Sequence, residues 1–195
     1  MSNKEGYYNG RKDDLLDGRY VVEKRLGNGT FGSVYYCTNT DGSQPVAIKV
    51  IRNIPKYKEA GYRELETLRL VETQQCRHVV RLLDSFEFQG HVALVFPLYG
   101  CTLLELLRAN EFRGFNLDWT RELARCVLVG IKALHDVGRV HTDVKPENIM
   151  TRRNPISTPV RGRMFVHPAG ADLVLIDLGS AVAVDRPRPL LVCTR

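Results

Sequence analysis

The spacing of apolar residues predicts a first half of the chain that is rich in strands. Residues 18–37 hold two runs of β-branched and aromatic residues on either side of a glycine-rich turn, and residues 44–51 hold a third run that begins beside a proline. Residues 57–72 are rich in Glu, Leu, Arg and Ala, which favours a helix. Residues 78–98 predict two apolar strands around a turn at Gln89–Gly90. The first hundred residues therefore predict the order β-β-β-α-β-β.

After the first hundred residues the apolar spacing becomes that of a helix. Residues 102–112 predict a short helix and residues 117–138 a longer one, with Asp118 as the expected N-cap and Gly138 as the expected stop. The longer helix carries an amphipathic stripe with apolar residues three or four positions apart: Trp119, Leu123, Val127, Ile131 and Leu134.

These elements predict an α+β fold in two lobes. We expect a polar lead-in over residues 1–17, a strand-rich lobe over residues 18–99 and a helical lobe over residues 100–195. A chain of 195 residues, 44% hydrophobic and 26% charged, can bury the one or two cores that such a fold needs.

Composition narrows the class of protein. The net charge of +6 would suit an acidic partner or a polyanion, although a moderately basic domain with no nucleic-acid role is the favoured interpretation. Five scattered cysteines without a CxxC pair indicate neither a disulfide framework nor a zinc site, which favours a reducing intracellular compartment. The first residues are polar and no apolar run reaches about 18 residues, so neither a signal peptide nor a membrane span is expected.

A glycine-rich motif lies between the first two strands, with the pattern Gly27-x-Gly29-x-x-Gly32-x-Val34. Glycines let the backbone approach phosphates that side chains would keep away. The same spacing occurs in dinucleotide-binding folds, but there the glycines lead into a helix. Because residues 33–37 predict another strand, the motif here predicts a hairpin that covers a nucleotide.

A lysine at the end of the third strand, Lys49, needs an anion or a counter-charge unless it faces solvent at the edge of the sheet. Glu64, in the predicted helix, is the expected partner. Glu59 and Glu66 are alternative partners on the same helix.

The stretch Asp143-x-Lys145-x-x-Asn148 has the residue types that phosphoryl transfer needs. Asp143 would orient a hydroxyl and accept its proton, Lys145 would neutralise the transferring phosphoryl group, and Asn148 would give a metal ion an oxygen ligand. Asp177 follows an apolar run over residues 173–176, as a buried strand would deliver a metal-binding acid to a cleft. Each motif alone also fits a charged surface turn, but their joint order is specific.

In this order the motifs resemble those of eukaryotic protein kinases, over residues 20–195. The sequences HTD, KPEN and CTR, with the lead-in KEGYYNGRKDDLLDGRYVV, resemble the LAMMER (CDC-like) kinases, with the SR-protein and DYRK kinases as neighbouring families. The long interval from Asn148 to Asp177 fits a hairpin insert over residues 151–171, as in LAMMER kinases. The sequence DLG is closer to the SR-protein kinases, but the large spacer that separates their lobes is not present.

The resemblance implies a kinase fold that uses ATP and Mg²⁺. It implies that Asp143 is the catalytic base and that Lys145 and Lys49 are further catalytic residues. It also implies that Asn148 and Asp177 bind Mg²⁺. The residues that it implies for nucleotide binding are Leu26, Gly27, Asn28, Gly29, Thr30, Phe31, Gly32, Ser33, Val34, Ala47, Lys49, Glu64, Phe96, Pro97, Tyr99 and Met150.

Three residues depart from the kinase pattern. Pro97 stands where the family has an acid, but only its carbonyl is needed for the implied contact with adenine. Leu178 replaces a phenylalanine and keeps an apolar packing residue. Thr142 replaces the arginine that pairs with a phosphorylated activation segment in many kinases, so the resemblance implies activity that does not rely on that pair.

The sequence stops before the Ala-Pro-Glu segment and the later helices of kinase domains, so a truncated kinase domain is expected. The expected function is that of a serine/threonine or dual-specificity kinase in the nucleus and/or cytoplasm, with protein substrates such as arginine/serine-rich splicing factors. One alternative is a catalytically inactive nucleotide-binding or interaction module. The other is a basic RNA-associated protein, but no RNA-recognition motif is present, so direct nucleic-acid binding is not expected. That alternative would use Arg152, Arg153, Arg161 and Arg163.

Overall fold

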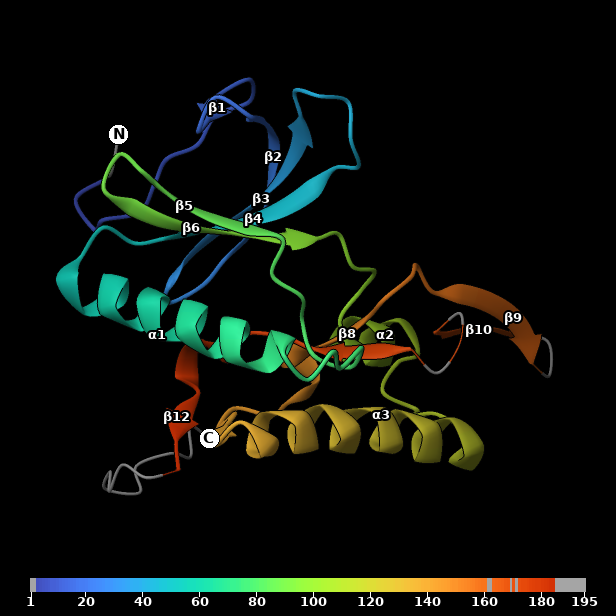
Figure 1. The fold of residues 1–195 in the computed structure, drawn as a ribbon. Coiled ribbons are helices and arrows are strands. Elements are labelled where there is room, and N and C mark those ends of the chain that lie inside the picture. Colours follow the sequence, from blue (N-terminus) through green and yellow to red (C-terminus); the bar gives the residue numbers. More distant parts are fainter. Residues whose placement is uncertain (1–2, 161–162, 169, 171, 185–195) are drawn as a thin grey trace. The chain divides into compact units, whose positions relative to one another are not determined.

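The computed structural model describes residues 3–160, 163–168, 170 and 172–184 (Figure 1). Arg161 and the CTR sequence at the end of the chain lie outside the described residues.

Contacts divide the chain into two compact units. The first is Met1–Arg69 with Arg81–Leu98, and the second is Leu70–Val80 with Tyr99–Arg195. The main division therefore falls beside Leu98, where the apolar spacing changes from that of strands to that of helices. Residues 70–80, which we expected in the strand-rich lobe, group with the second unit.

The first unit is an antiparallel sheet with one long helix in its described part. The strands lie in the order β1-β2-β3-β4-β6-β5, and each neighbouring pair is antiparallel. The predicted order β-β-β-α-β-β is confirmed, and the short strand β1 in the lead-in is an addition to it. The bounds are β1 Leu15–Leu16, β2 Tyr20–Asn28, β3 Gly32–Asn39, β4 Val46–Ile51, α1 Pro55–Glu72, β5 Asp84–Phe88 and β6 His91–Pro97.

Alternation along β3 and β4 places two sets of side chains on opposite faces of the sheet. Tyr35, Ile48 and Val50 belong to the buried core, whereas Ala47 and Lys49 are only partly buried. Successive residues of a strand point to opposite faces. Ala47 and Lys49 therefore share the face that is turned away from this core.

The lead-in is part of the same core. The Tyr8 ring lies edge-on against Tyr35 and Phe88, with 5.7 Å between the ring centroids in each pair. Its hydroxyl donates to Asp14 Oδ2 at 2.8 Å. Burial, together with the Asp14 carboxylate, raises the pKa of the Tyr8 hydroxyl above its ordinary value. The segment that the sequence predicts as a polar lead-in thus supplies an aromatic core residue.

The second unit combines helices with short antiparallel strand pairs: β7 with β12, β8 with β11 and β9 with β10. The bounds are α2 Leu103–Ala109, α3 Leu117–Asp136, β7 Arg139–Val140, η1 Pro146–Asn148, β8 Ile149–Thr151, β9 Ile156–Val160, β10 Arg163–His167, β11 Leu173–Leu175, η2 Leu178–Ser180 and β12 Val182–Ala183. No helix in the described part of the chain is both long enough and apolar enough to pass through a bilayer.

A hairpin formed by β9 and β10 lies within the predicted insert of residues 151–171 (Figure 1). It is fastened to the end of α2 by the Asn110 side chain. Asn110 Nδ2 donates to the Val166 carbonyl at 2.6 Å, and the Val166 amide donates back to Asn110 Oδ1 at 2.9 Å. The rings of Phe115 and Phe165 pack edge-on beside this contact.

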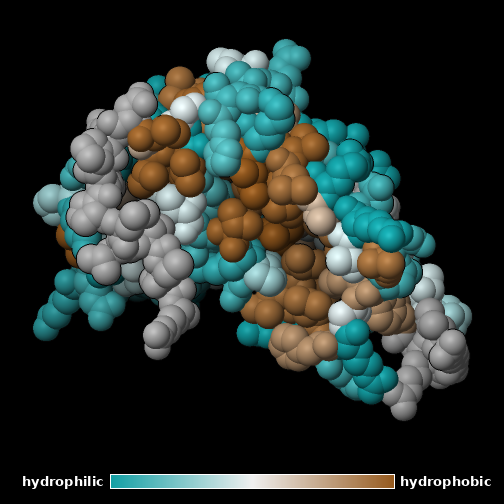
Figure 2. Space-filling view, turned by 90° about the horizontal axis from the view of Figure 1, so that it is seen from below, coloured by the Kyte–Doolittle hydropathy of each residue, from teal (hydrophilic) through white to brown (hydrophobic). Residues whose placement is uncertain are grey.

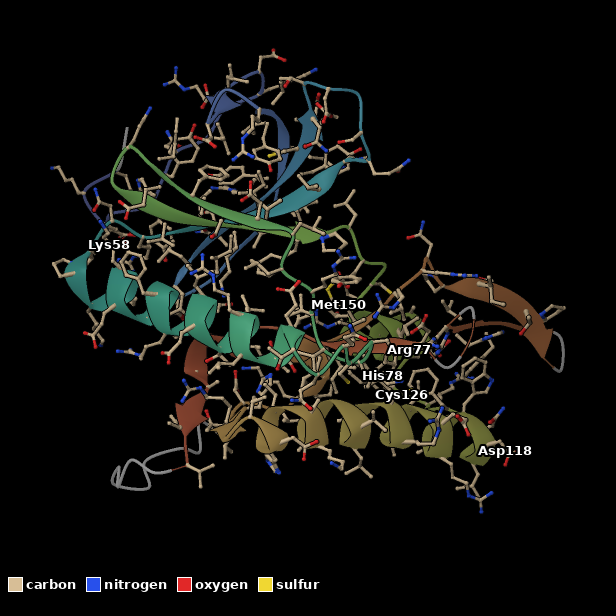
Figure 3. The ribbon with its side chains drawn as sticks, viewed as in Figure 1. Lys58, Arg77, His78, Asp118, Cys126 and Met150 are labelled. Carbon is tan, nitrogen blue, oxygen red and sulfur yellow. The ribbon has the colours of Figure 1, made fainter. Side chains whose placement is uncertain are left out.

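The start of α3 differs from the prediction. Asn116 is the N-cap, because its side-chain oxygen accepts a hydrogen bond from the Trp119 amide at 2.9 Å. Asp118 instead lies inside the first turn, where its charge suits the helix dipole, and it projects from the end of α3 with 92% of its side chain exposed (Figure 3). The predicted stop is confirmed, since Gly138 adopts a φ of +67° and donates its amide to the His135 carbonyl.

One face of α3 is buried and the opposite face is not. Figure 2 looks onto the underside of α3, where hydrophobic side chains gather among hydrophilic ones. On this helix Leu128 is 64% exposed and its neighbour Val129 is 39% exposed. The predicted stripe is confirmed in part, because Trp119, Val127 and Ile131 are half-buried at the border of the buried face. That face comprises Leu123, Cys126, Gly130, Ala133 and Leu134.

Gly130→Ala should destabilise the second unit although alanine is the better helix former. An added Cβ would lie 2.7 Å from the His78 carbonyl oxygen, which accepts the Leu175 amide at 2.9 Å. We expect the steric cost, about 2–3 kcal/mol because backbone must move, to exceed the gain of about 1 kcal/mol from helix propensity. The free energy of unfolding in urea should therefore fall. As the control, Ala124→Gly on the exposed side of α3 should lose about 1 kcal/mol. A gain of stability in Gly130→Ala would contradict this packing.

Candidate functional site

The glycine-rich turn joins β2 to β3. The Ser33 hydroxyl donates to Asn28 Oδ1 at 2.5 Å across the turn, and the Gly29 amide donates to the Gly32 carbonyl at 2.8 Å. Gly32 has no room for a side chain, because a Cβ would lie 2.2 Å from the Val50 carbonyl oxygen. The turn is therefore the strand–turn–strand hairpin that the sequence predicts rather than the start of a helix.

Strand register places further predicted nucleotide contacts on one face of the sheet. Val34 lies opposite Lys49, and Ala47 lies opposite Phe96. All four residues are partly buried, whereas their neighbours along β3 and β4 belong to the core. This face therefore offers apolar surface beside one lysine.

Lys49 forms an ion pair with Glu64, the expected partner. The Lys49 Nζ atom lies 2.8 Å from each carboxylate oxygen of Glu64, and the two side chains are 13% and 3% exposed. The alternatives Glu59 and Glu66 are both exposed. The structure thus selects Glu64 from the three candidates.

Glu64 points inward because of its position on α1. It shares a buried stripe of the helix with Ala60, Leu68 and Val71, which recur at helical spacing. A carboxylate on such a stripe is taken out of water and must be paired. Lys49 supplies that pair from β4.

In the second unit, His141 holds the beginning of the loop that carries Asp143. The Nε2 atom of His141 donates to the Ile176 carbonyl at 2.9 Å, while Nδ1 accepts from the Asp143 amide at 3.2 Å. These two partners require the tautomer that is protonated on Nε2. Burial lowers the pKa of His141 below its ordinary value, which keeps the ring neutral near pH 7.

Asp143, Lys145 and Asn148 form one cluster, as their spacing predicts. The Oδ2 atom of Asp143 accepts from Asn148 Nδ2 at 2.9 Å and lies 2.8 Å from Lys145 Nζ. Asn148 Nδ2 also donates to the Asp143 carbonyl at 2.9 Å. The hydrogen bond from Lys145 to the carboxylate raises the pKa of the lysine. Both partners use Oδ2, and no described residue donates a hydrogen bond to Oδ1.

Asn148 and Asp177 offer oxygen atoms of the kind that Mg²⁺ binds. The Ile176 amide donates to the Asn148 carbonyl at 2.9 Å, which holds the residue before Asp177 against Asn148. Because Asn148 Nδ2 is bonded to Asp143, its side-chain oxygen is the atom left for an ion. One carboxylate and one amide oxygen fit an ion that keeps water and phosphate oxygens as its other ligands. Within the described residues no group of three or more His, Cys, Asp or Glu forms an all-protein metal site.

Met150 and Tyr99 complete the predicted nucleotide contacts. Met150 lies on β8, opposite Val174 of β11 (Figure 3), and the Arg152 guanidinium lies 5.7 Å from the centroid of the Tyr99 ring. The predicted residues of the first unit are Leu26, Gly27, Asn28, Gly29, Thr30, Phe31, Gly32, Ser33, Val34, Ala47, Lys49, Glu64, Phe96 and Pro97. Those of the second unit are Tyr99, Asp143, Lys145, Asn148, Met150 and Asp177.

Thr142 has an unusual backbone conformation. Its φ of +66° lies in the left-handed region that β-branched residues rarely adopt. Its hydroxyl donates to the Ser180 carbonyl at 2.8 Å, next to the paired strands β7 and β12. The loop of Asp143 is therefore joined to the segment after Asp177 by a hydrogen bond that needs no phosphate.

Two residues of this site, His141 and Ser180, were not predicted from the sequence. Both act through a backbone carbonyl, His141 as the donor to Ile176 and Ser180 as the acceptor from Thr142. A carbonyl is present at every residue, so neither contact leaves a side-chain pattern in the sequence. The available signal for His141 was its position two residues before Asp143.

Thr142→Val keeps the branched shape of the side chain but removes the hydroxyl. The Ser180 carbonyl then loses its donor, and we expect the free energy of unfolding in urea to fall by about 0.5–1.5 kcal/mol. Thr142→Ser keeps the hydroxyl and is the control, which should stay near the parent. Equal losses in the two variants would show that the hydrogen bond contributes nothing.

The chain matches the family model of the protein kinase domain over residues 20–194. It is 34% identical over 206 residues to serine/threonine-protein kinase AFC1 of Arabidopsis thaliana, a match that covers 99% of this chain and 44% of that protein. It is 31% identical over 203 residues to dual specificity protein kinase CLK1 of Mus musculus, covering 99% and 41%. It is 32% identical over 201 residues to dual specificity protein kinase lkh1 of Schizosaccharomyces pombe, covering 100% and 29%. The predicted resemblance to protein kinases of the CDC-like type is confirmed.

The fold also matches a solved crystal structure of a kinase domain. The TM-score is 0.83 at 24% identity, over 98% of this chain and 60% of that one, which shows a shared fold. The chain spans from 23% to 51% of the length of the curated relatives that it matches.

Proposed function

The chain belongs to the protein kinase domain family, and on that premise we propose that it binds ATP with Mg²⁺ and transfers the γ-phosphoryl group to a protein hydroxyl. The observation that carries the proposal is the cluster around Asp143. One oxygen of that carboxylate is held by Asn148 and Lys145, and the other has no hydrogen bond to a described residue. Such a carboxylate is fixed in position yet open on one side.

Asp143 would act as the base through Oδ1. A substrate hydroxyl attacks the γ-phosphorus, the bond from that phosphorus to the β,γ-bridging oxygen breaks, and the hydroxyl proton passes to Oδ1. Lys145 keeps its ion pair with Oδ2, and from that position its charge also offsets the negative charge of the transferring phosphoryl group. His141 accepts a hydrogen bond from the Asp143 amide and so keeps the loop in position.

Lys49 would bind the phosphates of ATP. Glu64 holds the lysine on the face of the sheet that carries Val34 and Ala47, so the ammonium group need not be ordered when the nucleotide arrives. The apolar residues on that face would pack against adenine. Mg²⁺, held by the Asn148 side-chain oxygen and the Asp177 carboxylate, would supply neutralising charge for the phosphates.

The CDC-like resemblance supports a finer proposal. The substrates would be serine and threonine side chains, with tyrosine added if the chain shares the dual specificity in the names of its CLK1 and lkh1 relatives. The expected class of substrate would be arginine/serine-rich proteins in the nucleus. We further propose that the Thr142–Ser180 hydrogen bond takes the place of a phosphate–arginine pair, so phosphatase treatment should leave the activity unchanged.

Thermal melts with and without Mg-ATP test the nucleotide site. The parent should melt several degrees higher with ATP near 100 times its Kd, which corresponds to about 2.7 kcal/mol. The double variant Lys49→Met/Glu64→Gln removes the lysine without leaving a buried unpaired carboxylate, and it should lose the shift. Lys132→Met, at a lysine that is 72% exposed, is the matched control and should keep it. A parent that shows no shift would refute nucleotide binding by this chain.

Phosphotransfer to a mixture of serine- and tyrosine-containing peptides tests the chemistry. Asp143→Asn should retain the ATP-dependent shift but lose phosphotransfer by about 10²–10⁴-fold, because it removes the base while keeping an oxygen that can accept from Asn148. A parent that binds ATP without transferring phosphate would instead identify a nucleotide-binding module.

A further inference from the structure

Three successive carbonyl groups in the glycine-rich turn are held by donors from outside the turn. The Tyr7 hydroxyl donates to the Gly29 carbonyl at 3.0 Å, and Arg52 Nη1 donates to the Thr30 carbonyl at 3.3 Å. The Arg52 amide donates to the Phe31 carbonyl at 2.9 Å. A turn of this kind has few contacts of its own, so these donors determine how its peptide groups are oriented.

Arg52 is itself fixed from two sides. Its guanidinium lies 4.3 Å from the ring centroid of Tyr7 and 4.4 Å from that of Tyr57. Its Nε and Nη2 atoms both donate to the Glu5 carbonyl, at 2.8 and 2.6 Å. One planar side chain thus joins the lead-in to the turn.

The lead-in that delivers Tyr7 is attached to the chain beyond β4. The Asn53 amide donates to the Gly6 carbonyl at 2.7 Å. Gly6 has a φ of +77°, and a Cβ on it would lie 2.7 Å from Ile54 Cγ1, so glycine is required for this approach. Tyr7 therefore reaches the turn from a fixed segment.

Holding the carbonyls also orients the amides. In a trans peptide the N–H of one residue points opposite to the C=O of the residue before it, and the described residues contain no cis peptide. With the Gly29 and Thr30 carbonyls turned toward Tyr7 and Arg52, the Thr30 and Phe31 amides point the other way. Neither amide donates to a backbone carbonyl within the described residues.

We propose that Tyr7, acting with Arg52, is a positioning residue for phosphate binding: it holds the turn so that the Thr30 and Phe31 amides are available to the phosphate groups of a nucleotide. The proposal rests on the proposed function. According to this proposal, the lead-in contributes to the affinity for the phosphates but not to the affinity for the adenosine moiety.

Tyr7→Phe tests this assignment, since it removes the hydroxyl and leaves the ring on Arg52. Titration calorimetry with Mg-ATP and, separately, with adenosine should show ATP binding weakened about three- to tenfold, the effect of one lost hydrogen bond, with adenosine binding unchanged. Tyr57→Phe is the matched control, because it is in the same ring cluster and its hydroxyl bonds to no described residue. It should bind both ligands as the parent does.

Arg52→Lys is the second variant. Lysine keeps a cation near the rings but cannot hold the Glu5 and Thr30 carbonyls together, so ATP binding should again weaken and adenosine binding should not. Equal weakening for both ligands in either variant would reveal a general structural role and overturn the proposal. Unchanged ATP binding in Tyr7→Phe would overturn it while leaving the proposed function intact. A parent that binds adenosine and ATP equally would overturn this proposal alone, whereas a parent that binds neither would overturn the proposed function as well.

Discussion

The ion pair between Lys49 and Glu64 is the interaction on which the first unit depends. Glu64 is placed by helical spacing on a stripe of α1 that is otherwise apolar, and Lys49 is placed by strand alternation on the face opposite the core. Each charge alone would be buried at a cost of several kcal/mol. Together they join helix to sheet at one point. The pair therefore links α1 to β4 and holds the only lysine of β4 in place.

Much of this arrangement could be predicted from the sequence, because its periodicities are local. The strands follow from alternation, and the glycine-rich hairpin follows from the strand-like residues on both sides of it. Even the choice of Glu64 over Glu59 and Glu66 could have been made from helical phase, since only Glu64 shares the stripe of Ala60 and Leu68. The spacing of Asp143 and Asn148 likewise brought their side chains together as expected.

The remaining features could not be read from the sequence because they depend on contacts between distant segments or on backbone groups. Asn116 and Asp118 are equally good capping residues by type, and only the path of the chain decides between them. In the sequence, residues 70–80 look like the end of a helix and the start of a strand. In the structure, the His78 carbonyl packs against Gly130 of α3. The role of Tyr7 requires a hydrogen bond across 22 positions to a glycine carbonyl.

The buried position of Tyr8 bears on where this fold begins. The family match starts at residue 20, but Tyr8 and Leu16 lie in the same core as Tyr35, with 3% and 0% exposure. A protein trimmed at the start of the match would lack the Tyr8 ring and would leave a cavity in the hydrophobic core of the first unit. Recombinant fragments designed from family boundaries alone would thus begin inside a folded unit, and water would reach Tyr35 on β3, the strand that follows the glycine-rich turn.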